Sequence, residues 1–195
     1  MINVRLLMLL GVYVMSAGAA SAETFLPQHD ITLSGRIVAP SCQAQLDTNK
    51  LTFLLSKKGE PRRQTISLTL SECDISGLGI RFGSTVQTQH PERGVLKDSA
   101  KRPASDIWFT VGPVFRPEEK SLFSLATDST DLVKGDGNTL YFKLGGQNYW
   151  FEVDESTGGQ TLNFPFEVLL HRKNHSQPQN NDNYSANFAL QLSYR

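Results

Sequence analysis

The 195-residue sequence lacks an excess of charge, long apolar runs in its body and sustained helical periodicity. Lysine plus arginine number 19, as do aspartate plus glutamate, so no charged field points to nucleic acid. No apolar run beyond the N-terminal region is long enough for a transmembrane helix. Valine, isoleucine, threonine and aromatic residues alternate with clusters of turn-forming residues, which is typical of an all-β domain.

The N-terminus has the layout of a secretory signal peptide. Arg5 precedes the apolar segment 6–15, which is too short to span a bilayer comfortably, and Ala20-Ser21-Ala22 fits the small-x-small cleavage pattern. We expect residues 1–22 to be removed before Glu23, so that the mature chain is exported. An uncleaved membrane anchor is the alternative.

Cysteine is scarce, with only Cys42 and Cys73 in the chain. Exported proteins meet an oxidising compartment, so the pair is expected to form one structural disulfide. A metal site would need further ligands at close spacing, and neither cysteine has them.

No constellation of catalytic or metal-binding residues is evident. His171 and His175 are four residues apart, but they leave an expected strand for a loop and do not share a helix face. The chain contains no Gly-x-Ser-x-Gly motif, and Gly77–Gly83 lacks the spacing of a phosphate-binding loop. We therefore expect no enzyme activity, no cofactor and no metal, and we interpret Gly77–Gly83 as a turn entering a strand.

The pattern predicts about eight short strands and therefore a β-sandwich. The expected strands lie within residues 31–42, 51–55, 64–70, 107–111, 140–144, 149–153, 162–170 and 184–195. Residues 145–148 are expected to close a hairpin, and 117–125 to form a short helix. Pro165 places its strand at an edge or bulge, and residues 84–105 are expected to be irregular.

The C-terminal stretch Tyr184–Arg195 carries the clearest strand pattern. Its apolar and polar residues alternate at every second position up to the end of the chain. Chain termini usually fray unless they are tied down. This strand is therefore expected to dock into a sheet or into a partner.

The chain resembles fimbrial subunits of the chaperone–usher class, the type 1 pilus family. Three stretches carry the resemblance: Ile31–Cys42 with Gly35 seven residues before Cys42, Ile66–Cys73 ending in Leu-x-x-Cys, and the C-terminal alternation with penultimate Tyr194. The resemblance implies an incomplete immunoglobulin-like β-sandwich, the pilin fold, which lacks its last strand and is completed by a donor strand. Residues 23–34 would be the donor arm, and residues 35–195 the pilin-like domain.

The resemblance also implies which residues take part in assembly. On the donor arm the shared face is Phe25, His29, Ile31, Leu33 and Gly35. On the acceptor strand the corresponding residues are Phe188, Leu190, Leu192 and Tyr194, together with the terminal carboxylate of Arg195. A periplasmic pilus chaperone would first lend a strand to the open groove, and a neighbouring subunit would later replace it.

The leading expectation is therefore a structural pilus subunit that contributes to cell adhesion and is exported through the periplasm to a surface fimbrium. Its partners would be the chaperone, an outer-membrane usher and neighbouring subunits. A terminating, anchoring or tip-associated minor subunit is the alternative within this class. An exported carbohydrate-binding β-sandwich protein is the alternative of another class.

Overall fold

The computed structural model describes residues 28–37, 42–54, 62–114, 123–125, 131–135, 139–153, 161–173 and 183–195. All regular structure in these ranges is β-strand, which confirms the all-β prediction. The strands are β1 Gln28–Ile37, β2 Gln43–Leu46, β3 Lys50–Leu54, β4 Arg62–Ser71, β5 Gly77–Ser84, β6 Val86–Gln87, β7 His90–Lys97, β8 Pro103–Pro113, β9 Phe123–Leu125, β10 Val133–Lys134, β11 Leu140–Tyr141, β12 Gly145–Val153, β13 Leu162–Arg172 and β14 Tyr184–Tyr194. No helix in these ranges is long and apolar enough to cross a membrane.

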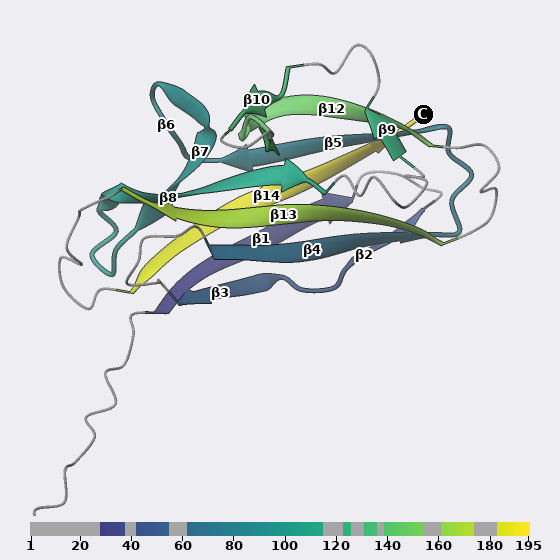
Figure 1. The fold of residues 1–195 in the computed structure, drawn as a ribbon. Helices are drawn as coiled ribbons and strands as arrows, with labels where there is room; N and C mark the ends of the chain where they lie inside the picture. The colour runs from purple at the N-terminus through teal and green to yellow at the C-terminus, as the bar shows by residue number, and fades with distance from the viewer. Residues whose placement is uncertain are drawn as a thin grey trace, which may run out of the picture.

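The strands form a curled sheet whose two halves face each other, as in a β-sandwich (Figure 1). One half follows the order β2-β4-β13-β8-β7, and the other contains β14, β5, β12 and β9, with β1 and β3 on the far side of β14. The halves are joined where β7 meets β14 through the pair Ser185 and Lys97. Alternating apolar positions of both halves therefore point into one space between them.

The core between the halves is rich in phenylalanine. Three ring pairs cross it, with centroid distances given in order: Phe82 with Phe166 at 5.6 Å, Phe109 with Phe188 at 5.8 Å, and Phe151 with Phe164 at 4.6 Å. These rings are almost completely excluded from solvent. Edge-to-face and tilted packing of this kind adds to the stabilisation from burial alone.

The expected disulfide is present between Cys42 and Cys73, whose Cα atoms are 4.7 Å apart. It lies where β2 begins and β4 ends, and these two strands are neighbours that pair Gln43 with Ser71. The bridge therefore closes one end of the β2–β4 ladder.

Replacing both Cys42 and Cys73 by serine is expected to lower the free energy of unfolding by about 3–4 kcal/mol. The bridge closes a loop with a sequence separation of 31 residues, and chain-entropy estimates give about this value for such a loop. Urea unfolding of the oxidised protein and the double variant measures the difference. Reduced wild-type protein is the control, and an unchanged urea midpoint would contradict the prediction.

The glycine-rich segment 77–83 is part of strand β5, so its interpretation as a turn was wrong. Leu78, Ile80 and Phe82 point into the core and are completely buried. The glycines fall on the opposite face, where a Cβ on Gly79 would lie 3.0 Å from the Trp150 ring. Glycine at this position lets the indole lie directly against the sheet.

Two other local predictions were also wrong. Residues 140–144 and 149–153 do not form a hairpin with each other, because β11 pairs with β10 while β12 lies between β5 and β9. Residues 123–125 form strand β9 rather than the end of a helix, and residues 117–122 lie outside the described ranges. In both cases pairing with distant strands overrides the local signal.

The supposedly irregular segment 84–105 contains β6, β7 and the start of β8. Pro165 lies in a central strand, since β13 has β4 on one side and β8 on the other. The carbonyl of Pro165 accepts a hydrogen bond from Val114 N, one residue beyond the end of β8. Proline has no N–H to return this hydrogen bond, and the pairing of β13 with β8 ends at Phe166 opposite Pro113.

Candidate functional site

The candidate site is the position that β1 occupies between β14 and β3, called here the β1 position. β1 runs parallel to β14, from His29 opposite Tyr184 to Ile37 opposite Leu192. On its other edge β1 runs antiparallel to β3, from Gln28 opposite Leu54 to Thr32 opposite Lys50. Figure 1 shows β1 in purple beside β14 in yellow, so the first and the last strand of the described chain are neighbours in one sheet.

Among the β1 side chains that the structure describes, His29, Ile31 and Leu33 lie on the inward face. All three side chains are buried, with exposed fractions of 0%, 0% and 4%. Ile31 and Leu33 pack within the same core as the inward residues of β14 and β3. Burial of an isoleucine and a leucine stabilises by about 1.5–3 kcal/mol each, so β1 contributes substantially to its own domain.

The outward face of β1 is polar and is fixed to β3. The Asp30 carboxylate forms an ion pair with Lys50, with an N–O distance of 3.1 Å, and accepts a 2.9 Å hydrogen bond from the Thr52 hydroxyl. Further along, Leu33 N donates to the Asn49 carbonyl. Exposed ion pairs contribute little to stability, so the apolar face provides most of the attachment.

His29 is the exception on the inward face, because it is polar. It lies opposite Phe53 on β3 and opposite Tyr184 on β14, and its ring centroid is 5.3 Å from that of Tyr184. Neither ring nitrogen has a hydrogen-bond partner among the described residues. Burial lowers the pKa of His29 from 6.5 to about 4; nearby Asp30 opposes this shift, and Arg172 adds to it.

The expected acceptor residues lie along β14 next to β1. Phe188, Leu190 and Leu192 point into the core and are buried, and the Phe188 ring contacts both Phe82 and Phe109. The Tyr194 hydroxyl is buried without a partner in the described part of the chain, and this burial raises its pKa. β14 therefore pairs with other strands of the sheet along both of its edges. Docking into a sheet was one of the two outcomes predicted for this strand, and docking into a partner was the other.

The C-terminal residue is held by the sheet. The Arg195 carbonyl oxygen accepts hydrogen bonds from Ser76 N and Gly77 N, and its own N–H donates to Gly77 O. Its guanidinium lies over the Trp150 ring, 4.8 Å from the centroid. One oxygen of the terminal carboxylate, which the resemblance assigns to chaperone binding, is thus engaged within the chain.

The predicted donor arm is only partly within the described residues. Phe25 lies outside them, whereas His29, Ile31 and Leu33 are brought together on the inward face of β1. Gly35 lies in the same strand, opposite Leu190. The expected boundary between arm and domain, after residue 34, falls inside β1.

Sequence reasoning missed the contribution of β3 to this site. Leu51 and Phe53 are buried and form the flank of the β1 position opposite β14. Both residues belong to a short apolar run that predicted a strand, but no residue near that run indicated which other strand would lie beside it.

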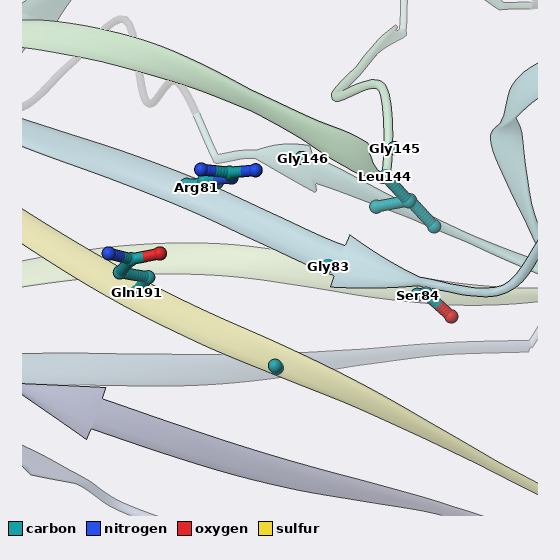
Figure 2. Close-up of a pocket in the computed structure, with 8 residues that line it drawn as sticks. Arg81, Gly83, Ser84, Leu144, Gly145, Gly146 and Gln191 are labelled. Atoms are coloured by element: carbon teal, nitrogen blue, oxygen red, sulfur yellow. The ribbon is translucent and has the colours of Figure 1, made fainter.

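A shallow hollow of about 340 Å³ lies on the outer face of β5, β12 and β14 (Figure 2). Its floor is formed by small residues, including Gly83, Gly145 and Ala189, with Arg81 and Gln191 at one end. The Ser84 hydroxyl at the other end already donates toward the carbonyls of Thr85 and Asn187.

The outer face of β8 and β13 carries His171, one of two histidines four residues apart that were not expected to bind a metal. Its Nε2 lies 2.8 Å from the Thr110 hydroxyl, and its ring stacks on Trp108. His175 lies outside the described residues. Within the described ranges, no three histidine, cysteine, aspartate or glutamate residues gather as metal ligands would.

Neither a scan against protein-family models nor a search of curated proteins found a match to this chain.

Proposed function

We propose that this chain is a structural subunit of a chaperone–usher fimbria, assembled by donor-strand exchange and contributing to cell adhesion. The observation that carries the proposal is the β1 position. The second edge of the C-terminal strand is covered by β1, whose inward face includes the buried side chains of Ile31 and Leu33. Such a segment is a natural candidate for replacement by an equivalent strand from a neighbour.

The direction of β1 favours such replacement. β1 pairs parallel to β14, and parallel pairing is slightly less stable per residue than antiparallel pairing. Its direction in the chain is constrained because β2 begins at Gln43, shortly after β1 ends at Ile37. A strand from another subunit has no such constraint and can pair antiparallel with β14.

In this proposal the chain is an incomplete immunoglobulin-like sandwich, and β1 fills the position of the missing strand within its own domain only while no partner strand is bound there. The chaperone occupies the position during export, and the usher brings a second subunit whose residues 23–34 take its place. The apolar residues Phe188, Leu190 and Leu192 then hold either β1 or the incoming strand. The subunit performs no catalysis.

Deleting residues 23–34 is expected to preserve chaperone binding and to abolish growth of the polymer. The deletion removes His29, Ile31 and Leu33 from the donor and leaves β14 as an acceptor. Co-expression with a pilus chaperone and usher, followed by purification of chaperone complexes and electron microscopy of surface fibres, measures both steps.

The double substitution Thr32→Ser with Ser34→Thr is the matched control, because both side chains are exposed on the outer face of β1, and it should assemble normally. Polymers formed by the deleted chain, or failure of the complete chain to bind chaperone, would contradict the proposal. If the chain never exchanges strands, the result would instead favour a carbohydrate-binding protein. The hollow beside Arg81 on the outer face of β5, β12 and β14 would then be the first surface to test for carbohydrate binding.

A further inference from the structure

His29 is the one ionisable side chain on the inward face of β1 among the residues whose side chains the structure describes. Its exposed fraction is 0%, equal to that of Ile31 two residues later. Among the described residues both of its ring nitrogens lack a hydrogen-bond partner. A buried polar group without a partner costs stability even when it is neutral, and much more when it is charged.

The described residues around His29 offer little compensation for a positive charge. On β14 it meets the Tyr184 ring, and on β3 it lies opposite Phe53. Arg172 on β13 carries a like charge that disfavours protonation. Asp30 on β1 favours protonation, but its carboxylate already pairs with Lys50 and Thr52 on β3.

The location of His29 determines what its protonation would disturb. It sits near the start of β1, and β1 is attached to the rest of the sheet only through β14 and β3, as far as the described residues show. Moving β1 out brings the imidazole into water, where the charged form is solvated. The core strands β13, β8 and β5 do not need to open for this to happen.

We propose that His29 makes β1 an acid-released strand: protonation of its buried ring weakens the attachment of β1 between β14 and β3 and exposes their apolar edges. The proposal concerns β1 within a single chain. Its failure would leave the proposed assembly unaffected, and a chain that does not assemble could still release β1 in acid.

The direction of the effect follows from the protonation equilibrium. The pKa of His29 is about 4 when the ring is buried and returns to the ordinary histidine value of 6.5 in water, so the released strand binds protons more tightly. The attachment of β1 is therefore strongest above about pH 6.5, where the ring is neutral in both states, and it weakens progressively as the pH falls toward 4. At pH 4.5 the opening equilibrium of β1 should be about 50-fold larger than at pH 7.

Amide hydrogen exchange of the purified chain between pH 7 and 4.5 tests this, after correction for intrinsic exchange rates. In wild type, the corrected exchange of β1 amides should rise about 50-fold while β13 stays protected. In His29→Phe, which keeps a ring but cannot titrate, the rise should disappear. His29→Leu serves as a second variant in case phenylalanine does not fit.

His90→Gln is the matched control, because His90 is a partly exposed histidine paired with Glu92 on β7. It should keep the wild-type response. The proposal is overturned if wild-type β1 does not become more open in acid, if His29→Phe and His29→Leu respond as wild type does, or if β1 and β13 lose protection together.

Discussion

Replacing Leu190 by arginine is expected to prevent the chain from reaching its folded state. Leu190 is buried between β1 and β5, opposite Gly35 on one side and Phe82 on the other. The substitution removes about 1.5–3 kcal/mol of burial and introduces a cation without a partner, so the total loss should exceed about 4 kcal/mol. Domains of this size are usually stable by only about 5–15 kcal/mol.

The matched control is Asn187→Arg, which places the same side chain on the exposed face of the same strand. Its effect should be within about 0.5 kcal/mol. Soluble yield and urea midpoints of both variants measure the contrast, and co-expressed pilus chaperone should not rescue Leu190→Arg. Equal stability of the two variants would mean that the inward face of β14 is not the core face.

Strand β14 could be predicted from the sequence for a physical reason. A strand with one buried face must alternate, and its period of two is visible without knowing its neighbours. The same holds for Ile66, Leu68 and Leu70 on β4. The disulfide was also predictable, because the chain has only two cysteines and neither has the closely spaced further ligands that a metal site would need.

Strand β5 shows where that reasoning fails. Its inward residues alternate as clearly as those of β14, but glycine on the other face made the segment look like a turn. Those glycines are explained by residues distant in sequence: Trp150 lies against Gly79, and the Arg195 side chain covers Gly77. No local pattern contains this information.

The strands that pair with β1 could not be predicted from the sequence, for a different reason. The alternation of His29, Ile31 and Leu33 indicates that this face will be buried. Docking onto strands of its own chain and docking onto strands of a neighbouring chain would bury the same side chains, so the alternation does not distinguish the two. The structure shows the pairing within one chain, through β14 and β3. Which pairing prevails in an assembly depends on chain connectivity and concentration, which a pattern of residues does not encode.

Removing β1 is expected to have the second large effect. A chain that begins at Val38 should aggregate, because Phe188 and Leu190 on β14 and Phe53 on β3 lose the strand that covers them. The loss of Ile31 and Leu33 alone amounts to about 3–6 kcal/mol. Two unpaired strand edges are exposed at the same time, and such edges promote association between chains.

A synthetic peptide of residues 28–37, supplied during refolding, should restore a soluble one-to-one complex. The peptide with Thr32→Asp should also restore it, since Thr32 is exposed, whereas the peptide with Ile31→Asp should fail because Ile31 is completely buried. Light scattering and native mass spectrometry distinguish complex from aggregate. A soluble monomer without any peptide, or equal rescue by both variants, would show that the β1 position is not a site for strand addition in trans.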